Sequence, residues 1–468
     1  TELETVEVEG RRINHNDPGR SLVLQKPTEQ QSHEGGTRLD LDGDNFKIIS
    51  RWIREGAVRQ QSRKLINFAF TADEPLPTSV GDTVQLRSIA TFDDGNSASV
   101  LSWTVVKPDD PSAVRIDEQG TLTLLRPGRQ ILVARYLDRV VPLELVVPLL
   151  TDYSATEPKV AGNPVDRFVN ARLHQMRLKP ADRTSEAALT RRLCLDLTGR
   201  LPMSVLTEAD RHHATDKAVL VDQLLASDAF NDLWTHRLAQ SLEVRALGRQ
   251  SDAASAYYNW LRNAVARDEP LDSVTRQLLL AEGDRVSNPP ASFYTVRPDP
   301  REMAEFVSRV FLGVRLQCAN CHDHPLDAWT QDDYHGLAAI FAGVKSGPVV
   351  TFTQSGEIIH PATGDAAVAK IPGRGFLNPT QDYRDVLTEW LTSAENAYFA
   401  RSAVNRIWKH LMGRGLVEPV DDLRVTNPAT HPKLLDWLTQ DFINNGFRTR
   451  HIIRTICLSD AYGRSSTP

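Results

Sequence analysis

Hydrophobic and polar positions follow three different patterns along the chain. The first 57 residues are mostly polar, and near their end Phe46, Ile49 and Ile53 recur at helical spacing. Residues 58–150 change to a period of two, and residues 151–468 return largely to helical spacing. Side chains share a face every 3.6 residues on a helix and every two on a strand, so these changes predict a multidomain protein.

The middle stretch alternates apolar and polar residues in short runs that turn sequences separate. We expect strands at residues 84–90, 114–116, 121–124, 130–136 and 143–147. Asp93-Asp94-Gly95-Asn96 and Asp117-Glu118-Gln119-Gly120 consist of residues that favour turns. Short strands with regular turns over about 90 residues predict a small β-sandwich for residues 58–150.

The remainder of the chain predicts a large, mainly α-helical region in two parts. Helical spacing is found in residues 151–345 and again in residues 385–468. Residues 346–384 are richer in Gly, Pro and Thr, and we interpret them as a linker or an irregular insert.

Composition and charge narrow the class of protein. The 468 residues are 41% apolar and 24% charged, as in ordinary globular proteins, and the net charge is −6. Nucleic acid is therefore not an expected partner. The sequence has no run of eighteen apolar residues, so we expect no transmembrane segment. The chain has four cysteines, of which Cys194 and Cys457 lie in apolar helical stretches typical of a protein core.

The other two cysteines belong to the motif Cys318-Ala319-Asn320-Cys321-His322. We expect the motif on a loop between two helices. Asp299 should cap the first helix, which begins with Pro300, and Thr330 should cap the second, with Asp333 completing a variant of the capping box.

This spacing is the one that covalent attachment of a c-type haem requires. Two thiols have to reach two vinyl groups on one porphyrin edge, and the histidine that follows can then ligate the iron. With four cysteines and thirteen histidines, the motif would occur by chance in roughly one chain in a thousand of this composition. Cys318, Cys321 and His322 are therefore the candidate haem c ligands.

Three alternatives for the cysteine pair remain open. It could bind structural zinc together with His324 and a distant donor, form a strained disulfide, or consist of two buried thiols. His324 follows His322 too closely to reach the opposite face of the same haem. It is therefore a better zinc ligand, or a neighbour that supports the haem ligand, than a sixth ligand.

Weaker candidates lie in the last part of the chain. Asp421, Asp422 and His431 could line a pocket, as in a polysaccharide-processing enzyme, although we expect the acids to pair with Arg424 instead. Thr430 or His431 could cap the helix that Pro432 begins. His410 is expected on a helix face, with a distal haem ligand as the alternative.

The helical region resembles the paired domains of unknown function 1549 and 1553, which are common in secreted proteins of planctomycete-type bacteria. The first is also called a planctomycete cytochrome C domain. The resemblance is carried by residues 192–202, 299–304 and 318–331 for the first domain, and by residues 404–408, 413–422 and 431–438 for the second. The family implies no particular activity.

Two further resemblances concern the start of the chain. Residues 58–150 look like a group 2 bacterial immunoglobulin-like domain, and residues 1–57 resemble the C-terminal part of a planctomycete cytochrome c-like domain. The attachment motif of that domain would precede Thr1. The resemblance implies His33 as a distal ligand to a haem held by a second polypeptide or a missing segment. The alternative is a surface-loop histidine.

Together these inferences predict an extracytoplasmic c-type haem protein with an electron-transfer or redox role. It would be periplasmic, secreted or on the cell surface, with a redox partner protein, and it would be one piece of a longer product that begins with a signal peptide. An open sixth iron position would allow haem-dependent oxidoreductase activity. The alternative is a cell-surface interaction protein or a polysaccharide-processing protein, with a structural zinc or cysteine site.

Overall fold

A computed structural model describes most of the chain. The described residues are 6–7, 10–32, 36–41, 43–58, 63–150, 162–207, 216–245, 251–324, 327–353, 355–378 and 382–466. His33 lies outside them, so its predicted role as a haem ligand stays a prediction. The chain divides into two compact units, of which the second contains most of the β-rich region and all the helices from α3 onward.

The described residues of the N-terminal segment form two short strands and two α-helices. They are β1 (Val6–Glu7), β2 (Gly10–Arg11), α1 (Leu22–Gln25) and α2 (Asp44–Arg54). Ile13, Leu24 and Ile53 form a small core, against which Phe46 and Ile49 pack. The helix predicted from the spacing of Phe46, Ile49 and Ile53 is therefore present, with its apolar face inward.

The β-rich region is antiparallel, as expected. Its strands are β3 (Leu65–Ala72), β4 (Thr83–Phe92), β5 (Ser97–Ser99), β6 (Val105–Pro108), β7 (Val114–Ile116), β8 (Thr121–Leu124), β9 (Gly128–Tyr136) and β10 (Arg139–Val147). One sheet has the order β3-β4-β8-β7 with β5 paired to β4, and the other has the order β10-β9-β6. The alternation places Val84, Leu86 and Ala90 on a buried face.

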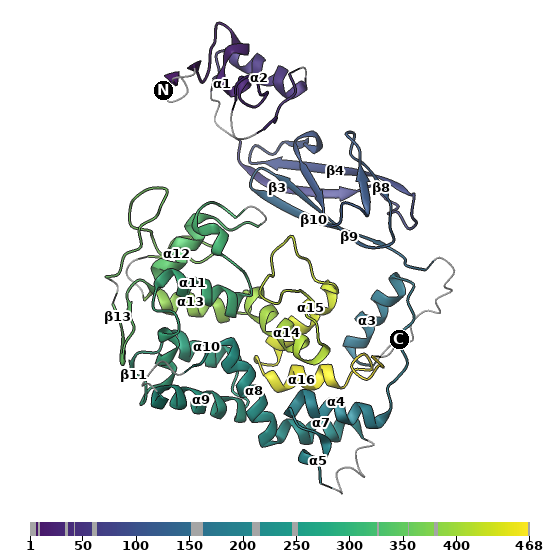
Figure 1. Cartoon of the computed structure of the whole chain (residues 1–468), viewed down its shortest axis with the longest axis vertical. Coiled ribbons are helices and arrows are strands. Elements are labelled where there is room, and N and C mark those ends of the chain that lie inside the picture. Colours follow the sequence, from purple (N-terminus) through teal and green to yellow (C-terminus); the bar gives the residue numbers. More distant parts are fainter. Residues whose placement is uncertain are drawn as a thin grey trace. The chain divides into compact units, whose positions relative to one another are not determined.

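The C-terminal region is helical. Its helices are α3 (Pro164–Gln175), α4 (Glu186–Thr198), α5 (Pro202–Val205), α7 (Lys217–Ala226), α8 (Asp228–Ser241), α9 (Ser251–Ala266), α10 (Leu271–Leu279), α11 (Pro300–Val307), α12 (Gln331–Phe341), α13 (Tyr383–Thr392), α14 (Ala397–Met412), α15 (Pro432–Asn444) and α16 (Thr449–Cys457). Helix α14 packs against both α15 and α16 (Figure 1). Buried side chains from α4 to α16 form a single hydrophobic cluster, so the region has one continuous core.

The helices that flank the cysteine motif begin where the sequence predicts. The Asp299 side chain accepts hydrogen bonds from the first backbone N–H groups of α11, and Thr330 and Asp333 form a capping box at the start of α12. Between them lie a π-helical turn (Ser308–Leu312) and a 3₁₀ turn (Gln317–Asn320).

The stretch predicted as a linker or insert is irregular but packed. Strand β13 (Val349–Phe352) pairs with β12 (Val344–Lys345) and with β11 (Gly283–Asp284). Further along, Lys370 donates its backbone N–H to the carbonyl of Gly336 on α12. A Cβ atom at Gly336 would lie 2.4 Å from the Cβ atom of Lys370, so only glycine permits this approach.

Candidate functional site

The cysteine motif forms an exposed turn. Cys318 and Cys321 are both exposed, and neither forms a disulfide. The 3₁₀ turn over Gln317–Asn320 buries Ala319 between them and turns the two thiols outward. The side chain of His322 is also exposed. The alternative of two buried thiols is therefore wrong for Cys318 and Cys321.

The imidazole of His322 is oriented by its own neighbour. Its Nδ1 lies 2.8 Å from the carbonyl oxygen of Asp323, which only an N–H can satisfy. In the neutral ring, Nδ1 therefore carries the proton and Nε2 has the lone pair. No interaction of Nε2 is found among the described residues. Metal-bound histidines usually donate their other ring N–H in this way, so His322 fits a haem-iron ligand.

Helix α12 holds the turn from one side. His335 Nε2 lies 3.0 Å from the carbonyl oxygen of Asn320, and Gln331 Nε2 lies 3.4 Å from the same oxygen. The carboxylate of Asp323 accepts the backbone N–H of Gln331 at 2.9 Å. The residues on both sides of Cys321 are thus hydrogen-bonded to a buried helix.

The sequence analysis did not identify His335 as a residue that supports the cysteine turn. The side chain is 1% exposed, and its ring lies 5.0 Å from that of His360, between centroids. Burial lowers its pKa, although the hydrogen bond to Asn320 opposes this. Gln331 and His335 are four residues apart on a helix that begins soon after the motif. That spacing was the available signal, because it places both side chains on one helix face.

The segment after α14 holds the turn from the other side. Arg315 donates to the carboxylate of Asp421 at 2.7 Å, and the backbone N–H of Leu423 donates to the carbonyl of Gly313 at 2.8 Å. Gly313 has a φ of +68°, and a Cβ atom there would lie 2.8 Å from Leu423 and from Ser402. Glycine is therefore required where the two segments meet.

Charged groups of both segments surround His324. The side chain is 9% exposed, and burial lowers its pKa, with Arg424 adding to the effect and Asp422 opposing it. Asp327 is also buried, which raises its pKa. The predicted pairing of Asp422 with Arg424 is present at 3.2 Å, whereas Asp421 pairs with Arg315.

These groups do not form a preassembled metal site. Among the residues that the structure describes, no three His, Cys, Asp or Glu side chains are grouped as metal ligands. Zinc bound by Cys318, Cys321 and His324 therefore stays a prediction, as does haem.

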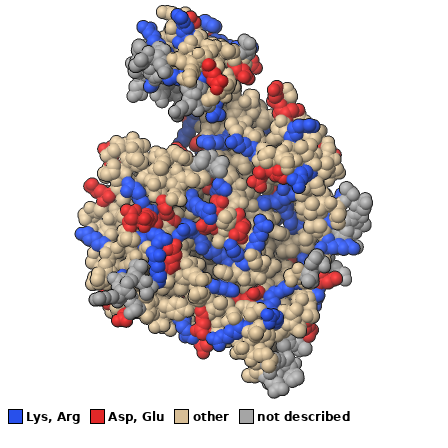
Figure 2. Space-filling model, viewed as in Figure 1, with Lys and Arg blue, Asp and Glu red and all other residues tan. Residues whose placement is uncertain are grey.

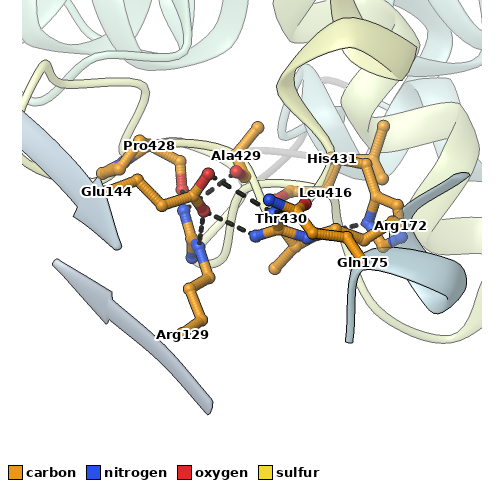
Figure 3. A network of polar contacts seen from close by, with 9 residues as sticks. All are labelled: Arg129, Glu144, Arg172, Gln175, Leu416, Pro428, Ala429, Thr430 and His431. Carbon is orange, nitrogen blue, oxygen red and sulfur yellow. Dashed lines mark hydrogen bonds and ion pairs between the residues drawn. The ribbon is translucent and has the colours of Figure 1, made fainter. Parts of the chain in front are cut away.

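His431 lies in a different network from Asp421 and Asp422. Figure 3 shows Glu144 of β10 between Arg129 of β9 and Arg172 of α3, with Pro428 and Ala429 beside them. Arg129 donates to the carbonyl oxygens of Pro428 and Ala429 at 2.7 and 2.9 Å.

Burial lowers the pKa of His431 to about 4, and Arg172 and Arg129 add to this effect. No hydrogen bond or ion pair between described residues joins His431 to Asp421 or Asp422, so a pocket lined by all three residues stays a prediction. His431 occupies the N-cap position of α15, but its side chain makes no capping hydrogen bond.

The remaining candidate residues from the sequence are Cys194, Cys457 and His410, and each packs against other side chains. Cys194 and Cys457 are both 0% exposed, as predicted for core residues. His410 lies edge-on to Trp234, with 5.9 Å between ring centroids.

On the face shown in Figure 2, acidic and basic side chains are interspersed over the helical region.

The fold and the turn define a protein with a β-rich region followed by helices that carry a Cys-x-x-Cys-His motif. Residues 164–346 match the family described as protein of unknown function (DUF1549), PSCyt2, and residues 383–468 match protein of unknown function (DUF1553), PSD1. The chain therefore carries these two domains in this order, which confirms this part of the resemblance seen in its sequence.

No curated protein matches the chain. Within the described ranges, no helix has both the length and the hydropathy that crossing a bilayer requires.

Proposed function

We propose that this chain is an extracytoplasmic c-type haem protein with an electron-transfer or redox role. The observation that carries the proposal is the turn at residues 318–322. It exposes two thiols that are not in a disulfide, together with an imidazole whose Nε2 lone pair is available. A c-type haem needs these three groups at this spacing.

The residues have separate roles in this proposal. Cys318 and Cys321 would each add a thiol across a vinyl group, so that an S–C bond forms and the thiol proton passes to the neighbouring vinyl carbon. His322 would ligate the iron, and its Nδ1–H bond to Asp323 would fix the ring. A bound haem supplies one-electron redox chemistry. His335 and Gln331 hold the turn in place from α12.

The proposal also includes the identity of the β-rich region, the location of the protein and its partners. We infer an immunoglobulin-like identity for the β-rich region and a periplasmic or secreted location, because covalent haem attachment takes place outside the cytoplasmic membrane. A redox partner protein would exchange electrons with the haem. His33 would serve a haem on a second polypeptide or a segment absent from this chain, and an open sixth position at the Cys318/Cys321 haem would permit oxidoreductase activity.

A pyridine haemochrome spectrum tests the proposal. Protein matured together with c-type cytochrome assembly factors should keep a haem spectrum after denaturation and acid-acetone extraction. Cys318→Ala/Cys321→Ala protein should lose it, whereas Cys194→Ala protein should keep it. If the native protein is colourless and elemental analysis finds zinc, the haem proposal is wrong and the cysteine pair binds zinc instead.

A further inference from the structure

A cavity lies in the core of the helical region, where elements of both matched domains meet. Its volume is about 140 Å³. Its walls come from α8, α10 and the π-helical turn on one side and from α14 on the other. The apolar part of the wall includes Phe230, Trp234, Leu278, Phe311, Phe399 and Ile407.

Three arginines also line this cavity, namely Arg237, Arg406 and Arg450. Arg237 and Arg406 donate to the backbone carbonyl oxygens of Asp196 and Arg309. Arg450 donates to the side chain of Asn231 and to two carbonyl oxygens. In the described part of the chain, none of the three forms an ion pair, although Asp196, Asp421 and Asp268 act on them electrostatically from a longer distance. Arginine stays protonated in proteins, so three positive charges border an apolar space.

The acidic groups of the lining are bonded elsewhere. The Glu269 carboxylate accepts hydrogen bonds from Arg267, Ser273 and Gln277. The Asp268 carboxylate accepts the backbone N–H of Arg450, and burial raises its pKa. The lining therefore holds three arginines against two carboxylates that already accept hydrogen bonds, which favours an anionic ligand over a cationic one.

Aromatic rings and a neutral histidine define the rest of the lining. The guanidinium of Arg237 lies 4.6 Å from the Trp234 ring centroid, and that of Arg450 lies 5.2 Å from the Phe230 ring centroid. His410 also lines the cavity, and burial together with Arg237 lowers its pKa to about 4, so it is neutral at pH 7. A ligand whose flat apolar body lies beside these rings would place its acidic group within reach of the arginines.

We propose that this cavity binds a small organic carboxylate with an aromatic or branched aliphatic body. The size follows from the volume, because an apolar cavity of about 150 Å³ holds benzene. The charge follows from the three arginines, which outnumber the two carboxylates of the lining. The cavity lies apart from the cysteine turn, so the proposal is independent of haem.

Calorimetric titration of the purified chain with phenylacetate tests the proposal. We expect one binding event, with benzyl alcohol, a neutral analogue of similar size, binding at least about tenfold more weakly. Arg237→Gln and Arg406→Gln should each weaken phenylacetate binding about tenfold or more. Arg401→Gln is the matched control, because Arg401 lies on α14 but pairs with Asp436 outside the cavity, and it should leave the affinity unchanged.

A cavity-filling variant locates the ligand. Ala403 lines the cavity, so Ala403→Phe should abolish phenylacetate binding while the circular dichroism spectrum stays native. If that variant does not fold, the Arg237→Gln/Arg406→Gln double variant decides. The proposal is overturned if phenylacetate does not bind at about 10 mM, if benzyl alcohol binds as tightly, or if binding survives in folded Ala403→Phe or in the double variant.

Discussion

At the scale of single residues, the four cysteines occupy two contrasting environments. Cys318 and Cys321 lie exposed on a turn, whereas Cys194 and Cys457 are fully buried in the helical core. Burial raises the pKa of the Cys194 thiol to about 11, and it also raises that of Cys457. Only a thiolate reacts readily, so the same burial that makes a cysteine a core residue also makes it inert.

This contrast predicts the thiol reactivity of haem-free protein. Ellman's reagent should titrate two thiols in the native state at pH 8 and four after denaturation, because Cys318 and Cys321 alone are accessible. Cys318→Ala/Cys321→Ala protein should show no fast-reacting thiol. Rapid reaction of all four thiols in the native protein would contradict the burial of Cys194 and Cys457.

At the scale of secondary-structure elements, α12 connects the cysteine turn to the irregular stretch after it. Asp333 is 2% exposed and uses both carboxylate oxygens. One oxygen caps α12 through Thr330, and the other accepts from Lys370 at 2.8 Å and from the backbone of Gly373 at 3.0 Å. The helix start and the segment around Lys370 are therefore stabilised by one side chain.

Removal of this carboxylate should be costly. Asp333→Ala removes half of the capping box of α12 and leaves the mostly buried Lys370 ammonium without its partner, so we expect a loss of about 3 kcal/mol in the free energy of unfolding. The neighbouring Asp332→Ala should cost less than about 1 kcal/mol, because Asp332 is half exposed. Urea denaturation of the two variants measures the difference, and equal losses would contradict the assignment.

The elements near the site divide into those that local sequence specifies and those that it does not. The caps at Asp299 and Thr330 could be predicted, because a cap depends on residues within one helical turn. The contact of Arg315 with Asp421 could not, since 106 positions separate them in the sequence. His431 shows the same limit. It lies only ten positions after Asp421 in the sequence, yet its side chain lies beside the Glu144 network and not beside Asp421.

At the scale of the whole molecule, the Glu144 network connects strands β9 and β10 to the helical region. Arg172 donates to Glu144 at 2.6 Å, and Arg129 bonds both to Glu144 and to the loop before α15. His431 adjoins this network as a neutral ring whose pKa is about 4 in the folded protein.

This depressed pKa predicts a contribution to acid sensitivity. The ordinary pKa is 6.5, so between pH 6.5 and 4 the unfolded chain binds a proton that the folded protein does not. Stability should therefore fall as the pH is lowered through this window. In His431→Gln protein, the loss of unfolding free energy between pH 7 and pH 5 should shrink by on the order of 1 kcal/mol. His174→Gln, at an exposed position, is the control and should behave like the parent.

Covalent haem attachment at the cysteine turn can be measured on one peptide. Trypsin should release residues 316–345 as a single fragment, because no Lys or Arg lies between Arg315 and Lys345. Mass spectrometry of this fragment, from protein matured with c-type assembly factors, should show one added haem on Cys318 and Cys321. Recovery of the fragment with both thiols unmodified, while a control cytochrome c from the same cells carries haem, would contradict the account.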